Sequence, residues 1–257
     1  MRIKLIIEYN GIGFCGWQRQ IDCKEHPSIQ ETVEAAISRV FGGDISIQLF
    51  CSGRTDSGVH ALGQVAHFDI CDTLLENRWS CKIRSMPKAI NYHLGTNAIA
   101  VKDASIVDDN FHARFSAKMR HYQYKIYNSY VDTVFMKDRA WHVHKALDIS
   151  KMLSGAQNFI GKHDFTSFCS SQSNDKNMVR TISRINITRN QDDMIIIDVS
   201  AKSFLHNQVR ITVGTLVDLG LGKIHPEDIT NIIAARDRRK ASQTAPAYGL
   251  YFMNVEY

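Results

Sequence analysis

The 257-residue chain lacks any long apolar run, and no stretch approaches the roughly 18–20 consecutive apolar residues of a membrane helix. Its first residues, Met-Arg-Ile-Lys-Leu-Ile-Ile-Glu-Tyr, include basic side chains but no long apolar core and no small-residue cleavage site. We interpret them as a strand rather than as a signal peptide. We therefore expect a cytoplasmic protein that makes no contact with a membrane.

The chain also lacks a C-x-x-C pair, although it contains 6 cysteines. Their spacing favours neither a zinc site nor a redox dithiol. The simplest interpretation is reduced thiols in a cytosolic protein. The cysteines are Cys15, Cys23, Cys51, Cys71, Cys81 and Cys169.

Proline is scarce, with 4 residues, and the composition of 44% hydrophobic and 22% charged residues is ordinary for a globular protein. This composition excludes a collagen, a coiled-coil rod and a disordered chain. A chain of this length buries roughly 70–75% of its unfolded surface and needs no disulfide or metal to fold. Length alone predicts one to two domains.

A large charge of one sign is missing as well, since 31 basic residues face 26 acidic ones and leave a net charge of +5. That excess alone barely favours a nucleic-acid partner. Its distribution says more, because residues 110–131, 201–217 and 238–255 contain no acid. In the first stretch aromatic and basic residues alternate, which suits either RNA contact or a half-buried strand with one solvated face. Three such stretches together favour contact with RNA or DNA.

Apolar spacing predicts an α+β fold in which each half has the approximate order β-α-β-β-α-β. We expect two ferredoxin-like halves, residues 1–107 and 108–257, whose antiparallel sheets join into one extended sheet with a central RNA-binding cleft. The predicted strands are Lys4–Tyr9, Ile45–Cys51, Val65–Ile70, one within Thr96–Val107, Arg120–Tyr127, Ile182–Arg189, Met194–Lys202 and Leu250–Glu256. The predicted helices are Ser28–Phe41, one near Arg78–Asn91, Ile149–Ile160, Leu205–Leu219 and Pro226–Ala235.

The segment Ser52–His60, SGRTDSGVH, is a candidate catalytic loop. Asp56 is the only carboxylate between Ile45 and Phe68, and glycines flank the loop. A lone acid in a cationic loop can serve as a nucleophile or a base, glycine lets the backbone approach a ligand, and Arg54 can hold the acid ionised or bind a phosphate. Composition alone favours a simpler interpretation, a tight turn that closes a hairpin.

Residues 53–67, GRTDSGVHALGQVAH, resemble the active-site segment of the TruA family of tRNA pseudouridine synthases. The resemblance continues in order along nearly the whole chain, and that succession of blocks is highly specific. The further matching blocks are residues 9–11, 16–20, 30–36, 111–117, 122–128, 163–168, 179–182, 204–210, 213–214 and 244–251.

This resemblance implies isomerisation of uridine to pseudouridine in tRNA, usually at positions 38–40 of the anticodon stem-loop. The N-glycosidic bond breaks, the uracil turns and a C–C bond forms to the same sugar. Because no redox change occurs, we expect neither a cofactor nor a metal. The family also implies a homodimer that shares each tRNA between its subunits.

The resemblance makes Asp56 the catalytic carboxylate, acting either on the anomeric carbon or by abstracting an adjacent proton. Arg210 matches the arginine that pairs with it, although a helix arginine can also contact an RNA phosphate. Arg54 would help to flip the target nucleotide or fill the gap that it leaves. Tyr122 would stack on the uracil and accept the C5 proton, and Leu250 would form the opposite apolar wall. Without the motif, strand packing and core filling are the default roles of these last two residues.

The chain departs from the family pattern at two places. His121 and Gln123 stand where many members carry arginine, which would weaken a phosphate contact. Residues 91–101 lack the Leu-Pro-x-Asp usual there. Neither departure touches Asp56.

Other candidate residues carry weaker expectations. His142 and His144 have the spacing of metal ligands on a strand, but we find no third ligand in register and favour a plain strand. His60 and His67 would orient the motif loop. The run Arg236–Lys240 is either a solvated helix end or an RNA contact.

Two other classes of function compete with the synthase. An RNA-binding module without catalysis, such as a tRNA folding chaperone, would be favoured by the loss of Asp56, Tyr122 or Arg210, and all three are present. A nucleoside hydrolase would need a second acid near Asp56 to activate water, and the local sequence offers none. The sequence does not identify which tRNAs or which uridines are modified.

Overall fold

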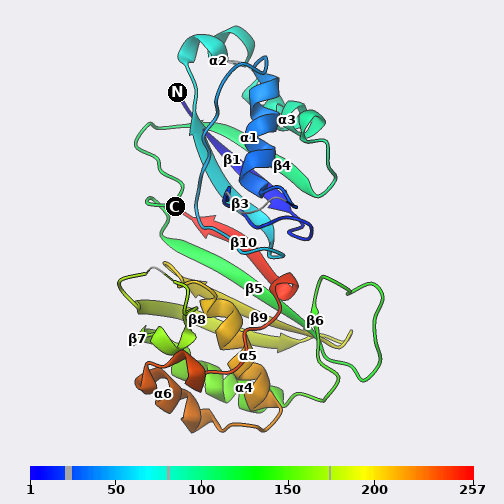
Figure 1. Ribbon diagram of the computed structural model, residues 1–257, viewed down its shortest axis with the longest axis vertical. Coiled ribbons are helices and arrows are strands. Elements are labelled where there is room, and N and C mark those ends of the chain that lie inside the picture. Colours follow the sequence, from blue (N-terminus) through cyan, green and yellow to red (C-terminus); the bar gives the residue numbers. More distant parts are fainter. Residues whose placement is uncertain (21–24, 80–81, 174) are drawn as a thin grey trace. The chain divides into compact units, whose positions relative to one another are not determined.

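The computed structural model describes residues 1–20, 25–79, 82–173 and 175–257 (Figure 1). The chain forms two compact units, Met1–Lys118 with Phe252–Tyr257 (unit 1) and Met119–Tyr251 (unit 2). Both units combine α-helices with a sheet, which confirms the α+β class. Cys23 and Cys81 lie outside the described residues. Within those residues, no helix has the length and apolar character needed to cross a membrane.

The sheet of unit 1 has the order β4-β1-β3-β10. Its central strand β1 (Arg2–Tyr9) pairs antiparallel with β3 (His60–Asp69) and β4 (Ile99–Val107), and β2 (Phe50–Cys51) pairs with β3. The last strand, β10 (Leu250–Glu256), contributes its residues from Phe252 onward to this unit. Every second residue of β1 is buried, as expected for a strand with one face on a core.

Helix α1 (Ile29–Val40) follows the predicted apolar spacing and is capped by the Ser28 hydroxyl, which accepts from the Glu31 amide. The predicted strand over residues 45–51 is wrong except at β2. Two side chains of α1 bind the backbone of Leu49 instead of a neighbouring strand. Glu34 Oε1 accepts from the Leu49 amide at 2.8 Å, and Gln30 Nε2 donates to the Leu49 carbonyl at 3.3 Å. The backbone of Leu49 is thereby satisfied without a strand partner.

The helix expected near residues 78–91 is replaced by two helices, α2 (Asp72–Arg78) and α3 (Met86–Leu94). Helix α3 ends at Gly95, whose positive φ of 66° is accessible to glycine at little cost. It contacts α1 and β4. The element order of unit 1 therefore contains one helix more than predicted.

Unit 2 has a sheet of order β5-β9-β8-β7. Its longer strands are β5 (Met119–Tyr127), β8 (Val179–Arg189) and β9 (Met194–Ala201), and the expected hairpin joins β8 to β9, with Asn190 donating to the Met194 carbonyl at 2.8 Å. Two short strands were not expected, β6 (Trp141–His142), which runs parallel to β5, and β7 (Gly161–Asp164). The helices are α4 (Ile149–Ala156), α5 (Gln208–Gly220) and α6 (Pro226–Ala235).

Contacts within the chain group residues 108–118 and Phe252–Tyr257 with unit 1. Long-range hydrogen bonds account for this grouping. The Ala113 amide donates to His67 Nδ1 at 3.2 Å, the Tyr257 hydroxyl donates to the Ala113 carbonyl at 2.9 Å, and the Lys118 amide donates to the Glu256 carbonyl at 2.8 Å. The two domains 1–107 and 108–257, as independently folding pieces, stay a prediction.

His67 is buried and binds the backbone of Ala113. It is 1% exposed and stacks on Phe50, with ring centroids 5.2 Å apart. Burial lowers the pKa of His67 to about 4, because a charged imidazole loses its hydration there. The neutral ring accepts the Ala113 hydrogen bond through Nδ1.

We predict that His67 makes the fold sensitive to acid. Its folded pKa lies below the ordinary value of about 6.5, so unfolding takes up a proton, and stability present above pH 6.5 is lost as the pH falls towards 4. Urea unfolding of the wild type should therefore lose about 2–3 kcal/mol more between pH 7 and pH 4.5 than His67→Gln does. His26→Gln, which changes an exposed imidazole, serves as the control and should retain the wild-type slope. An unchanged slope in His67→Gln would contradict the assignment.

Candidate active site

A buried polar network lies beneath the motif loop of unit 1. The hydroxyls of Tyr9 and Thr55 lie 2.7 Å apart, and Gln64 Nε2 donates to the Tyr9 hydroxyl at 3.3 Å and to the Gly53 carbonyl at 2.7 Å. The Ser52 hydroxyl donates to Gln64 Oε1 at 2.7 Å. All four of these side chains are at least nine-tenths buried, and their hydrogen bonds hold the loop from below. Burial also raises the pKa of Tyr9, which keeps its hydroxyl a donor.

The N-terminal motif lies directly against the same loop. The Trp17 amide donates to the Thr55 carbonyl at 3.0 Å. Gly16 has φ of +102°, and a Cβ there would lie 2.7 Å from the Thr55 carbonyl oxygen. Only glycine allows this approach. Two of the sequence blocks that carry the resemblance, residues 16–20 and 53–67, therefore pack against each other.

Above this network, Asp56 begins a tight turn, and Arg54 lies two residues before it. The Asp56 carbonyl accepts from the Val59 amide at 3.1 Å, and Gly58 has a φ of 79°. Arg54 is exposed and Asp56 is partly exposed. The tight-turn interpretation is thus correct as geometry, but the buried network gives the turn more support than closing a hairpin requires.

His60 orients this loop as expected. Its ring is 3% exposed, and Nδ1 accepts from the Gly11 amide at 3.1 Å. A Cβ on Gly11 would lie 2.1 Å from the Val59 carbonyl oxygen, so the two segments are in direct backbone contact.

In unit 2, Tyr122 lies on β5 with its ring partly exposed. It meets Phe204 edge to face, with centroids 5.2 Å apart. Its neighbours explain the departures from the family pattern, because both turn towards β9. His121 Nδ1 lies 2.8 Å from the Ser200 hydroxyl, and Gln123 Nε2 donates to Asp198 Oδ1 at 3.0 Å.

Arg210 lies in the first turn of α5. Its Nε donates to the Ala245 carbonyl and its Nη1 to Asn207 Oδ1, both at 2.8 Å. The segment containing Ala245 packs closely on the helix, since a Cβ on Gly214 would lie 1.9 Å from the Gln243 carbonyl oxygen. Neutral oxygens therefore fix the orientation of the guanidinium.

Leu250 begins β10 and is 6% exposed. The segment before it is held to β5 by Tyr124, whose hydroxyl donates to the Pro246 carbonyl at 2.7 Å. A Cβ on Gly249 would lie 2.5 Å from the Tyr124 ring. Sequence reasoning assigned no role to Tyr124, although its place two residues after Tyr122 puts both rings on one face of the strand.

Arg54 and Asp56 thus lie in the same supported loop of unit 1. In unit 2 it joins Arg210 and Leu250 through the segment of residues 243–250, which Tyr124 links to the strand of Tyr122. The pairing of Asp56 with Arg210 concerns the two units together and stays a prediction.

The sequence offers no third ligand in register with His142 and His144, but the fold places one beside them. Asp132 Oδ1 lies 3.1 Å from His142 Nδ1 and 4.0 Å from His144 Nε2. The chain after β5 folds back to place it there, and His142 Nε2 lies 2.8 Å from the Ser129 carbonyl oxygen. Among the described residues these three could hold a metal ion, but the Asp132 side chain is 86% exposed, and an exposed acid near histidines is common without a metal. We assign no metal to them.

Comparisons with known proteins identify proteins that the chain is similar to. A solved structure described as a Cbf5-Nop10-Gar1 complex gives a TM-score of 0.40 and 11% identity, over 97% of this chain and 48% of that chain. This similarity is too low to support an inference about the chain. Curated relatives named tRNA pseudouridine synthase A are much closer. They come from Ehrlichia canis (48% identical), Ehrlichia chaffeensis (47%) and Wolbachia sp. subsp. Drosophila simulans (45%), each over 257 residues and 100% of both chains.

The family model described as tRNA pseudouridine synthase matches residues 5–116 and 156–257. These ranges include the loop of Asp56 and the segment that ends at Leu250. With relatives aligned over its full length as well, the chain belongs to the TruA family of tRNA pseudouridine synthases.

Proposed function

We propose that the protein isomerises uridine to pseudouridine in tRNA, at positions 38–40 of the anticodon stem-loop. The bond from the sugar C1′ to uracil N1 breaks, and a bond from C1′ to C5 forms. The C5 proton leaves and N1 gains one, so the atoms balance without an oxidant or reductant. The observation that carries this proposal is Asp56, the lone acid of its loop, on a turn held by a buried network in a chain of this family.

Asp56 would supply the negative charge that an oxocarbenium-like sugar requires. Direct attack on C1′ and abstraction of an adjacent proton both use the same carboxylate, and both remain open. The absence of a second acid between residues 45 and 68 suits an isomerase, because an activated water would hydrolyse the nucleoside.

The remaining roles belong to the proposal too. Arg210 keeps Asp56 ionised, while Arg54 helps to flip the nucleotide or fills its place in the stack. Tyr122 stacks on the uracil and accepts the C5 proton, and Leu250 covers the other face of the base. Hydrogen bonds to Ala245 and Asn207 support the role of Arg210, because they fix its guanidinium in advance.

We further propose the predicted arrangement of two ferredoxin-like halves whose sheets join around an RNA-binding cleft, acting as a cytoplasmic homodimer that shares each tRNA. The reaction calls for neither cofactor nor metal. Sedimentation at micromolar concentration should give a dimer mass, and a single-chain mass would contradict the dimer.

We predict that Asp56→Asn abolishes pseudouridine formation while tRNA still binds, since losing one negative charge does not weaken affinity for a polyanion. Mass-spectrometric mapping of pseudouridine after incubation with tRNA measures the product. Asp103→Asn, an equal charge loss on exposed β4, is the control and should retain activity. Product from Asp56→Asn within tenfold of the wild-type rate would overturn the assignment. A wild type that binds tRNA without product would favour a binding module, and free uracil would favour a hydrolase.

We predict that Tyr122→Phe permits glycosidic cleavage but slows release of the C5 hydrogen by about 10²–10⁴. The ring remains, so stacking worth roughly 1–3 kcal/mol is retained and only the hydroxyl is lost. Hydrogen release from C5-labelled tRNA under single-turnover conditions tests this. Tyr127→Phe, on the other face of the same strand, is the control. Release at the wild-type rate would leave Tyr122 as a stacking platform only.

We predict that Tyr9 is a positioning residue. Tyr9→Phe removes the hydroxyl shared by Thr55 and Gln64, so the Asp56 turn loses part of its support. A displacement of about 1 Å costs up to about 10²-fold, and we expect kcat to fall about 10- to 100-fold with KM changed less than threefold. Tyr92→Phe, 84% exposed in unit 1, is the control. An unchanged kcat, or a change in KM alone, would argue against positioning.

A further inference from the structure

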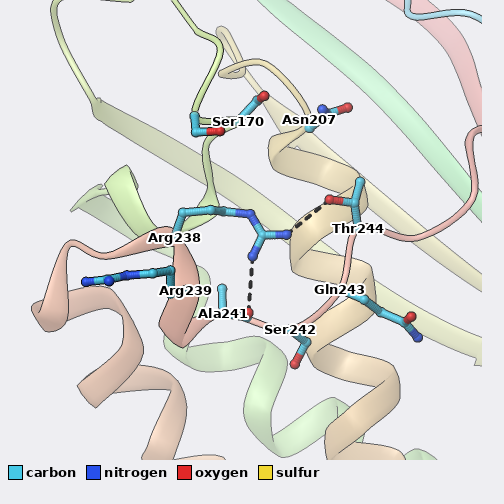
Figure 2. A pocket seen from close by; sticks show the side chains of 9 residues that line it. Ser170, Asn207, Arg238, Arg239, Ala241, Ser242, Gln243 and Thr244 are labelled. Carbon is cyan, nitrogen blue, oxygen red and sulfur yellow. Dashed lines mark hydrogen bonds between the residues drawn. The ribbon is translucent and has the colours of Figure 1, made fainter.

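A pocket of about 470 Å³ lies on unit 2 beside the start of α5 (Figure 2). Two of the three acid-free stretches of the sequence supply most of its walls, namely 201–217 and 238–255. Within the described part of the chain, its lining contains no carboxylate. The principal polar lining residues are Ser170, Asn207, Arg238, Arg239, Ser242 and Thr244.

Arg238 differs from the two neighbouring arginines, Arg236 and Arg239, in having no carboxylate partner within 4 Å among the described residues. Arg236 pairs with Asp164 at 3.1 Å, and Arg239 pairs with Asp237 at 2.8 Å. Arg238 is half-buried and donates only to neutral oxygens, the Ala241 carbonyl and the Thr244 hydroxyl, both at 3.1 Å. A partly buried cation without a counter-charge is costly, and an anion in the pocket would offset that cost.

Further hydrogen-bond donors surround the same space (Figure 2). Asn207 Oδ1 accepts from Arg210, so the amide nitrogen of Asn207 retains both N–H donors. The Thr244 hydroxyl accepts from Arg238, and the Ser170 hydroxyl accepts from the Gln172 amide, so each retains its own proton to donate. A guanidinium with amide and hydroxyl donors suits an anion that offers several acceptor oxygens.

We propose that this pocket binds a phosphate group of the RNA backbone, an inference that rests on tRNA being the substrate. The RNA backbone and free inorganic phosphate would both offer this pocket the same phosphate group. The RNA backbone is favoured as its source because Asn207 contacts both the pocket and Arg210, which places the pocket one hydrogen bond from a residue proposed to act at the target nucleotide. The arginines of the run Arg236–Lys240 then have different roles. Arg236 and Arg239 form surface ion pairs, and Arg238 binds the phosphate.

The test is tRNA binding to the full-length protein by fluorescence anisotropy across a series of KCl concentrations. Arg238→Gln should weaken binding about 5- to 20-fold near 0.1 M salt and reduce the slope of log K against log salt by about 1. Arg238→Lys keeps the charge and should recover most of the slope. Lys151→Gln removes one charge from α4 of the same unit, outside the pocket, and should bind as the wild type does.

A second variant keeps the proposal testable if Arg238→Gln disturbs the fold. Ser242→Asp leaves the hydrogen bonds of Arg238 in place and adds a negative charge to the lining, so it should weaken binding by a similar factor. Wild-type affinity and slope in Ser242→Asp and in a folded Arg238→Gln would overturn the proposal.

Two further measurements distinguish failure of the pocket proposal from failure of the proposed function. Titration of inorganic phosphate at constant ionic strength should show no saturation below millimolar concentration. Saturation below about 0.1 mM, with tRNA binding unchanged in the variants, would assign the pocket to a free phosphate instead. If the wild-type protein does not bind tRNA at all, the proposed function itself fails, whereas normal wild-type binding with unaffected variants rejects only the pocket.

Discussion

The structure of the motif loop depends on the hydrogen bonds between Tyr9, Thr55 and Gln64. These groups are buried, so each unmade bond would cost about 1–3 kcal/mol. The same network fixes the backbone at Gly53, just before the turn that carries Asp56. The catalytic role that we propose for Asp56 requires its carboxylate to be placed to within a fraction of an ångström, and buried, hydrogen-bonded polar groups can provide that precision. The buried network and the turn that carries Asp56 are thus parts of one hydrogen-bonded structure.

Unit 2 achieves the same precision differently, with backbone carbonyls as the fixed points. Tyr124 binds the Pro246 carbonyl, and Arg210 binds the Ala245 carbonyl. The chain between these contacts and Leu250 is therefore held to a strand and a helix at once. Close packing requires glycine on both sides of this contact, at Gly214 of α5, where the Gln243 carbonyl approaches, and at Gly249 of the C-terminal motif, which lies against the Tyr124 ring.

Local patterns predicted the elements whose causes are local. Helix α1, strand β5 and the β8–β9 hairpin formed where spacing and turn residues placed them. The errors came from tertiary contacts. Glu34 binds the backbone of Leu49 near β2, and the chain after β5 folds back to place Asp132 beside His142. Neither contact has a periodic signature in the sequence. The candidate site residues were named from motif blocks, whereas Tyr9 and Tyr124, which position them, were inside those blocks without an assigned role.

The basic run Arg236–Lys240 shows why a cluster of basic residues in a sequence does not by itself identify an anion-binding residue. Arg236, Arg238 and Arg239 lie within four residues of one another, yet only the outer two have carboxylate partners among the described residues. An exposed ion pair contributes about 0–1 kcal/mol and leaves little charge for a ligand. Arg238 is held by a carbonyl and a hydroxyl, which orient its guanidinium without neutralising it. Orientation without neutralisation is what an anion site requires, because the ligand itself then completes the charge balance.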